Sequence, residues 1–319
     1  MTTRLPDDPN RRVEADASER ARVAADQLSR VNGPLAQHAT VLALLLPPGS
    51  KRALRAWQIE CEANPFAAAL REHVAALPAA ARLPWFETLL VRLRSSPLPA
   101  RQALLEATRR LMGARGTVRP IDRLHWLVMR LRLGEALGVA APAGAGTTLS
   151  QLPQADVHAI AMFSAFLSRM VPMAEPAAVD VPEAAADVSE AAASATSTAA
   201  DAPSVAAKAM PTPTPSPTPG AAWYASVMAP WAHLGDVPPL TLPDTDGIVY
   251  ALHALQALAW MQRPVLVRGW VTAARQHSRH GRLSDSAADA LRLSCALLDS
   301  PLPPELARHY SAATPEAPA

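Results

Sequence analysis

The sequence predicts an all-α protein in which two helical domains are joined by a long disordered linker rich in Ala and Pro. Ala, Leu and Arg dominate the composition, and these residues rank high in helix propensity. Alternating runs of Val, Ile and Thr, which are typical of strands, are nearly absent from the 319 residues. Pro, Gly and Ser interrupt the apolar stretches at intervals that suit helices of ordinary length.

The composition changes along the chain and predicts its domain organisation. Residues 1–30 are highly charged, so we expect a mobile charged arm or a solvated first helix. A first helical domain follows over residues 31–171. Residues 172–221 have no large apolar core-forming pattern and cannot offset the entropy cost of ordering, which predicts the linker. Residues 222–312 form a second helical domain, and 313–319 a tail.

Turn residues delimit the helices of the first domain. Pro34 suits the first turn of a helix, and the stretch LPPGS at residues 46–50 ends that helix. The later breaks are the short stretches NP, LP, SSPLP, ARGTV and APAGAG. The helices expected between these breaks cover residues 51–62, 65–76, 79–95, 98–114, 119–137 and 153–171.

Tryptophan residues within apolar helical patterns are interpreted as core anchors rather than ligand-stacking groups. They are Trp57, Trp85, Trp126, Trp260 and Trp270. The stretch AAWYASVMAPW, which follows the linker, is interpreted as the first helix of the second domain, with a docking segment as the alternative.

A shared pattern in the two domains indicates an internal repeat. Gly116 and Gly281 lie 165 residues apart, and Pro99 is matched by Pro264 at the same offset. Each Pro suits the start of a helix, and each Gly allows a left-handed backbone where that helix ends. Further matches at this offset are Leu77 and Pro78 with Leu242 and Pro243, and Trp85 with Tyr250.

The two turns, LMGARGTVRPIDRLHWL and HSRHGRLSDSAADALRL, resemble the frame xDGxVxxxExxLL of tellurite-resistance-protein-B-like helical domains. The longer stretches beginning ATVLALLLPPGSKRALRAWQIE and LPAAARLPWFETLLVRL, with the late DALRLSCALLDSPLPPEL, resemble a region of known membrane enzymes. That region is the cytoplasmic C-terminal part of bacterial integral-membrane zinc metallopeptidases of the heat-shock and CAAX-prenyl-protease type. The resemblance covers roughly residues 30–135 and 240–307 and implies a helical module acting with such a peptidase.

Departures from these families argue against catalysis and metal binding. The sequence lacks the HExxH motif in which two His bind zinc and a Glu acts as base. Arg115 and His280 occupy the positions of the expected turn Asp, while the helical Glu is represented by Asp122 in one turn and falls near Ala287 in the other. A hard cation needs several oxygen ligands. We therefore expect no enzyme activity, no cofactor and no metal site in either turn.

One pair of His residues remains a candidate for binding a metal. His277 and His280 are three residues apart, which would place them on one face of a helix. The interpretation that we favour is the surface end of a helix without a metal.

A cluster of Arg residues in and around residues 101–132 forms a candidate binding face. Its members are Arg109, Arg110, Arg115, Arg119, Arg123, Arg130 and Arg132. The favoured interpretation is a solvated surface, and the functional alternatives are an acidic protein partner, an anionic membrane or nucleic acid. Nucleic acid is the least favoured, because no known binding motif or aromatic platform accompanies the charge.

These observations lead to an expected function. Cys61 and Cys295 are the two cysteines, and no apolar run reaches the roughly 18–20 residues that span a bilayer. We expect a cytoplasmic, non-catalytic interaction or regulatory module whose protein partner is a membrane metallopeptidase, with peripheral contact at the inner membrane as a variant. The alternatives are a diverged or split peptidase fragment and a basic module that binds nucleic acid or anionic lipid.

Overall fold

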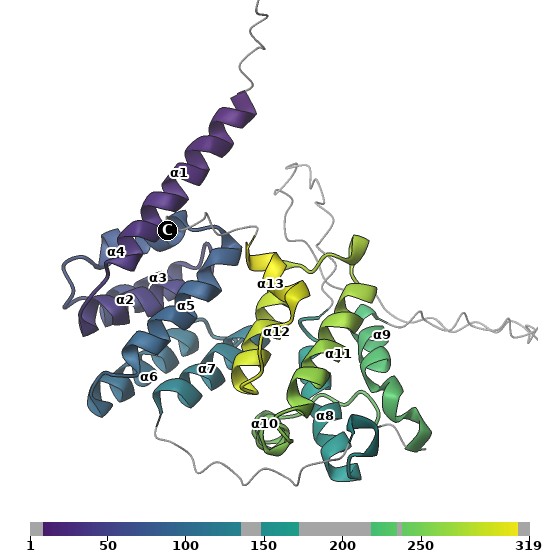
Figure 1. The fold of residues 1–319 in the computed structure, drawn as a ribbon. Coiled ribbons are helices and arrows are strands. Elements are labelled where there is room, and N and C mark those ends of the chain that lie inside the picture. The colour runs from purple at the N-terminus through teal and green to yellow at the C-terminus, as the bar shows by residue number, and fades with distance from the viewer. Residues whose placement is uncertain (1–8, 135–147, 172–217, 235–237, 312–319) are drawn as a thin grey trace, which may run out of the picture.

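The computed structural model describes residues 9–134, 148–171, 218–234 and 238–311, and over these residues it consists of helices without strands (Figure 1). The all-α prediction is confirmed. The α-helices are α1 (Pro9–Ser29), α2 (Pro34–Leu44), α3 (Lys51–Glu60), α4 (Ala67–Ala76), α5 (Ala79–Leu93), α6 (Leu98–Gly113), α7 (Pro120–Leu133), α8 (Gln154–Leu167), α9 (Pro219–Met228), α10 (Thr245–Ala257), α11 (Gln262–Gln276), α12 (Asp285–Leu297) and α13 (Pro304–Ser311). Short 3-10 helices are η1 (Leu149–Gln151), η2 (Ala229–Leu234) and η3 (Arg279–Gly281).

Helix ends agree closely with the turn residues of the sequence. Pro34 is at the start of α2, and Ser50, the last residue of LPPGS, caps α3 by accepting a hydrogen bond from the Ala53 amide at 3.2 Å. The helices expected at 119–137 and 153–171 are shorter than predicted and end at Leu133 and Leu167.

The N-terminal segment forms a helix rather than an arm over its described residues. The N-terminal part of α1 projects from the molecule, as Figure 1 shows, while its C-terminal part packs against α4. Ala21, Ala24 and Leu28 are buried in this contact region of α1. Of the two interpretations of residues 1–30, the structure therefore shows the first helix over residues 9–29.

The predicted linker falls largely outside the described residues, as does the predicted tail at 313–319. Its last residues belong to α9, because Thr218 caps this helix by accepting a hydrogen bond from the Ala221 amide at 3.3 Å. Trp223 and Tyr224 of α9 are buried, and so is Trp231 in η2. The favoured prediction of a helix in AAWYASVMAPW is confirmed.

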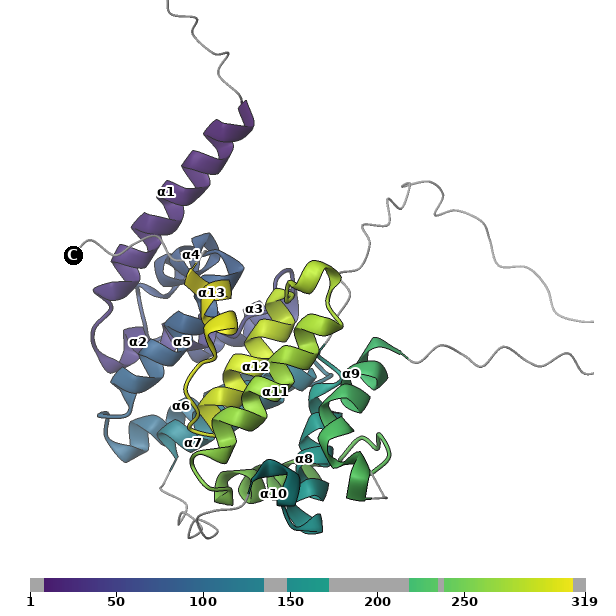
Figure 2. The same cartoon turned by 45° about the vertical axis from the view of Figure 1, so that its right-hand side comes forward.

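Helices from both halves of the chain pack around one continuous set of buried apolar residues. α7 packs against α12, and α8 packs against α10 and α9 (Figure 2). Trp270 of α11 donates a hydrogen bond from Nε1 to Ser164 Oγ of α8 at 3.1 Å, and both side chains are buried. The boundary predicted at residue 171 thus assigns α8 to the first domain, although α8 packs on α9 and α10, which belong to the second.

The helices of the structure follow the repeat that the sequence indicates. With the offset of 165 residues, α5, α6 and α7 correspond to α10, α11 and α12, with ends that differ by no more than two residues. Gly116 and Gly281 both have positive φ, of 84° and 67°. The equivalent pairs that are buried in both copies are Leu83 and Ile248, Phe86 and Ala251, Leu90 and Leu255, Leu93 and Leu258, Thr108 and Ala273, Asp122 and Ala287, Val128 and Leu293, Met129 and Ser294, and Leu133 and Leu298.

In each copy an Arg near the start of the second helix binds the end of the third helix, although the two Arg do not occupy equivalent positions of the repeat. Arg101 of α6 donates from Nη1 to the carbonyl of Leu133 at 2.9 Å. Arg263 of α11 donates from Nη1 to the carbonyl of the equivalent Leu298 at 3.2 Å. Both bonds satisfy carbonyl groups that a helix end leaves without an intrahelical partner.

Candidate functional site

The seven Arg residues of the candidate binding face do not form one exposed surface. Arg110 is held by Glu60, with Nε 2.5 Å from Oε1. Arg132 reaches across to α12 and donates to the carbonyl of Ala296 at 3.3 Å. Arg123 is half-buried, whereas Arg109 and Arg130 are exposed. The remaining two, Arg115 and Arg119, converge on one carboxylate.

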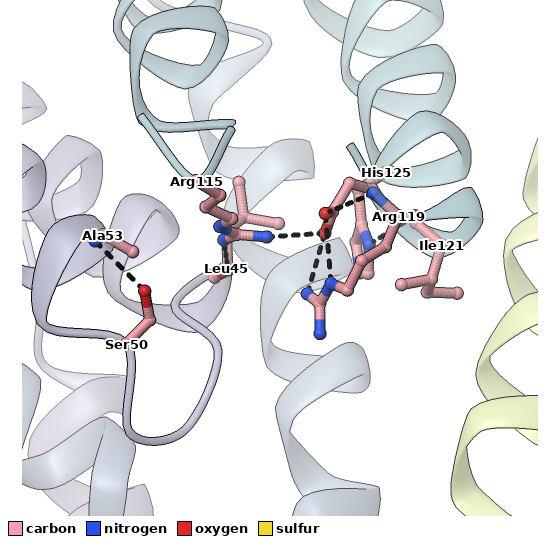
Figure 3. A network of polar contacts seen from close by, with 8 residues as sticks. Leu45, Ser50, Ala53, Arg115, Arg119, Ile121 and His125 are labelled. Carbon is pink, nitrogen blue, oxygen red and sulfur yellow. Dashed lines mark hydrogen bonds and ion pairs between the residues drawn. The ribbon is translucent and has the colours of Figure 1, made fainter. Parts of the chain in front are cut away.

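Arg115 is buried and belongs to an ion pair, which corrects its assignment to the binding face. Its side chain is 6% exposed and that of Asp122 is 3% exposed, and their charged groups are 2.8 Å apart. Arg115 also donates from Nη2 to the carbonyl of Leu45 at the end of α2, and so joins the α6–α7 turn to the α2–α3 turn (Figure 3). This contact explains why a charged side chain occupies the interior here.

Asp122 is fully engaged by the two guanidinium groups. Arg119 donates from Nη2 to Oδ1 at 2.8 Å and from Nε to Oδ2 at 3.1 Å, and its backbone amide donates to Oδ2 at 3.2 Å. Burial opposes ionisation of Asp122, but the hydrogen bonds and charges of Arg119 and Arg115 outweigh burial and lower its pKa. The guanidinium groups of Arg115 and Arg119 therefore occupy the acceptor sites of this carboxylate.

The second turn does not bring His277 and His280 to one helix face. His277 ends α11, and its Nε2 lies 2.8 Å from Ser226 Oγ of α9. His280 is exposed in η3 with a left-handed φ of 56°. Among the residues that the structure describes, no group of three or more His, Cys, Asp or Glu side chains is placed to hold a metal ion.

A hollow of about 460 Å³ lies between α6 and α7 on the part of the Arg cluster that remains exposed. The guanidinium carbon of Arg109 lies 4.6 Å from the ring centre of Trp126, a cation–π contact across the two helices. Trp126 is half-buried, so it is a core residue along one edge and a wall of the hollow along the other. The lining residues are Gln102, Leu105, Glu106, Arg109, Trp126, Arg130 and Gly134.

His125, next to Trp126 in α7, packs against α5 and does not add positive charge to the hollow. Its ring meets Phe86 of α5 edge-on, with ring centres 5.1 Å apart, and its Nδ1 lies 3.0 Å from the carbonyl of Ile121 (Figure 3). Burial lowers the pKa of His125 to about 4, so the ring is neutral at physiological pH. The positive charge of the hollow thus comes from Arg109 and Arg130, with Glu106 as the opposing charge.

A second polar cluster, which the sequence analysis missed, joins α12 and α13 to α5. Tyr310 donates its hydroxyl hydrogen to Asp289 Oδ1 at 2.9 Å. Arg292 pairs with Glu87 at 2.7 Å, and its guanidinium carbon lies 4.4 Å from the Tyr310 ring centre. No short spacing reveals the whole cluster, because Glu87 of α5 lies far in the sequence from the residues of α12 and α13. The cluster docks α13 on the rest of the molecule.

In the comparisons with known proteins, no family model, no curated protein and no solved structure matches the chain. None of the helices in the described part of the chain is long and apolar enough to cross a membrane.

Proposed function

We propose that this protein is a non-catalytic helical interaction module, and that the hollow between α6 and α7 binds an acidic segment of a partner protein. The observation that carries the proposal is the pairing of Arg109 with the Trp126 ring beside the exposed Arg130. A carboxylate can accept two hydrogen bonds from one guanidinium, and the ring gives an apolar surface for the rest of the segment. Trp and Arg are also the residues that most often dominate the binding energy of protein interfaces.

The remaining Arg residues support this choice by elimination. Arg110 and Arg119 are held by Glu60 and Asp122, and Arg115 is buried. Arg109 and Arg130 line the hollow together with Leu105, so this is where positive charge and apolar surface meet. The sequence resemblance suggests that the partner is a membrane zinc metallopeptidase, and the proposal keeps that partner class. A split peptidase fragment would use the same surface to rejoin its catalytic part.

The test is the binding of a fluorescently labelled Glu-rich peptide to the whole chain, measured by anisotropy. The double variant Arg109→Ala, Arg130→Ala should weaken binding by about tenfold or more, because each lost charge-assisted hydrogen bond contributes roughly 1.5–3 kcal/mol. Arg55→Ala, at an exposed position of α3, is the matched control and should leave binding unchanged. Equal affinity of the double variant and wild type would reject the hollow as the site.

A pull-down from the native host then tests the class of partner. Wild-type protein should recover a membrane protein containing HExxH, and the double variant should not. Recovery of nucleic acid that is lost at high salt would instead favour the basic-module alternative, since phosphate contacts weaken steeply with salt.

A further inference from the structure

The turn between α10 and α11 exposes large apolar side chains. Trp260 is 74% exposed and Met261 65%, and Val265, one helical turn further along the same face, is 56% exposed. The prediction that Trp260 is a core anchor is therefore wrong, because this Trp lies at a helix junction that faces solvent. Contiguous exposed apolar side chains are uncommon on soluble proteins and mark sites of interaction.

The other copy of the repeat shows that the fold does not require apolar residues at this turn. With the offset of 165 residues, Trp260 and Met261 correspond to Ser95 and Ser96 between α5 and α6, and Val265 corresponds to Ala100. A connection of the same length between the corresponding helices thus forms with small and polar side chains, although the backbone conformation at the ends of the two turns differs. The apolar residues of the second copy need an explanation other than folding.

The turn that carries Trp260 is anchored rather than loose. Arg263 donates from Nε to the carbonyl of Leu258 at 3.0 Å and from Nη1 to that of Leu298 at 3.2 Å, and Nη2 donates to the carbonyl of Gln256. Gln262 is buried, and its Oε1 accepts a hydrogen bond from the Ala259 amide at 3.2 Å. These bonds hold the exposed side chains on a firm base, which lowers the entropy cost of binding.

The charge around this turn is positive. No acidic residue occurs from Gly247 to Ser284, and Arg268 is exposed three residues beyond Val265 on the same side of α11. The end of α7 lies near the same end of α12, because Arg132 contacts the carbonyl of Ala296. Figures 1 and 2 both show the end of α7 and the start of α11 at the lower end of the molecule. Asp299, which follows Leu298, brings one opposing carboxylate.

We propose that the Trp260 tip, defined as Trp260, Met261, Val265 and Arg268, docks on the surface of a bilayer rich in anionic phospholipid. Trp favours the boundary between headgroups and acyl chains, and Arg can keep its charge among the headgroups while its stem lies on apolar surface. Basic residues near the membrane add attraction to anionic lipid. A stable protein interface buries about 800 Å² on each partner, which is more than a helix turn with three apolar side chains presents.

The test is flotation of the whole chain with vesicles of phosphatidylcholine alone and with vesicles rich in phosphatidylglycerol. Wild-type protein should float with the anionic vesicles. Trp260→Ser with Met261→Ser, which installs the residues of the equivalent turn, should reduce the bound fraction by about tenfold or more, because the inserted apolar surface is lost. Phe66→Ser removes another apolar side chain, 70% exposed, and should leave flotation unchanged.

A conservative variant keeps the proposal testable if the double variant does not fold. Trp260→Phe should still bind anionic vesicles, but acyl chains carrying bromine should quench its tryptophan fluorescence far less than that of wild type. Failure of wild type to bind either vesicle would overturn the proposal, and so would quenching that persists in Trp260→Phe. Sedimentation that shows a dimer dissociated by Trp260→Ser would also overturn it and assign the tip to contact between copies of the chain.

Discussion

At the scale of the residue, Arg115 is the clearest departure from a simple basic surface. Bringing a guanidinium and a carboxylate out of water costs free energy that their attraction only partly offsets. Hydrogen bonds from Arg115 to Asp122 and to the Leu45 carbonyl offset part of this free energy. Arg119 supplies the remaining donors to Asp122. The pair therefore fixes the position of the α6–α7 turn against α2 more than it adds net stability.

Removing one partner of this pair should be severe. Arg115→Met should lower the free energy of unfolding by about 3 kcal/mol, because it leaves Asp122 buried with Arg119 as its remaining cation. The double variant Arg115→Met, Asp122→Leu should recover much of that loss, since no buried charge is then left unpaired. Urea unfolding measures both. The exposed Arg55→Met is the control, with an expected change below about 0.5 kcal/mol, and a similar small value for Arg115→Met would contradict the structural role.

Asp289 should make stability depend on pH. Burial raises its pKa to about 7, while the hydrogen bond from Tyr310 acts in the opposite direction. A carboxyl whose pKa is raised by folding stabilises the folded state when protonated, so its contribution is complete below about pH 4 and is lost as the pH rises through about 7. Wild type should lose stability relative to Asp289→Asn over this window, as measured by urea unfolding at several pH values. A difference that stays constant with pH would refute this assignment.

At the scale of the element, the corresponding three-helix units share a Gly of positive φ in the turn before the third helix. Gly116 and Gly281 lie with positive φ in the turn that follows the second helix of each unit, and Arg101 and Arg263 bind the end of the third helix. The units differ in what this common geometry presents. The first unit buries an ion pair at its Gly turn. The second unit has the exposed His280 at its Gly turn, and its apolar tip lies in the preceding connection, between α10 and α11.

The Gly turn can be tested against a glycine inside a helix. Gly116→Ala should destabilise the protein by about 1 kcal/mol, because an L side chain is strained at this φ although no atom lies within 4 Å of the added Cβ. Gly269→Ala, in the interior of α11 and also without a neighbour within 4 Å, should instead stabilise it by up to about 1 kcal/mol. Thermal unfolding of both variants measures the two changes in stability. Changes of the same sign would refute the difference in backbone geometry between Gly116 and Gly269.

The sequence predicts the helices of the first half and where they start, although α7 and α8 end earlier than expected, and it does not predict the direction of individual side chains. Pro34, Ser50 and Gly116 act locally, so their effect on helix ends can be predicted without the fold. Arg115 and Arg109 lie in the same Arg-rich stretch, yet one is buried and the other exposed. The difference depends on the Leu45 carbonyl of a distant turn, which no short spacing reveals. The exposure of Trp260 cannot be predicted for the same reason. Apolar residues near Trp260 in the sequence do not establish that other side chains cover its ring in the fold.

At the scale of the whole molecule, the packing crosses the undescribed segment between Val171 and Thr218. α8 precedes this segment and packs on α10 and α9, which follow it, and α7 packs on α12. Buried contacts such as Trp270 with Ser164 and part-buried ones such as Arg292 with Glu87 reinforce this arrangement. The continuity of the chain between residues 172 and 217 is therefore not what holds the two halves together.

Cleavage of the chain tests this arrangement directly. A protease site placed within residues 172–217 should yield two fragments that elute together on size exclusion and separate when denaturant is added. The variant Trp270→Ala should weaken the association of the cleaved fragments, because it removes a fully buried aromatic side chain and its bond to Ser164. Fragments that separate without denaturant would show that the contacts of α7 and α8 with the C-terminal half are insufficient.

The contact between α7 and α12, the equivalent third helices of the two units, has a further consequence. Two separate identical chains would meet through such helices only at sufficient concentration, and every substitution would appear on both sides of their interface. Within one chain the two helices are tethered, so their effective concentration stays high at any dilution. Each unit is also free to specialise alone. Arg115 can fix the α6–α7 turn of one unit while Trp260 gives the other unit an exposed apolar tip, an asymmetry that a symmetric pair of identical chains could not possess.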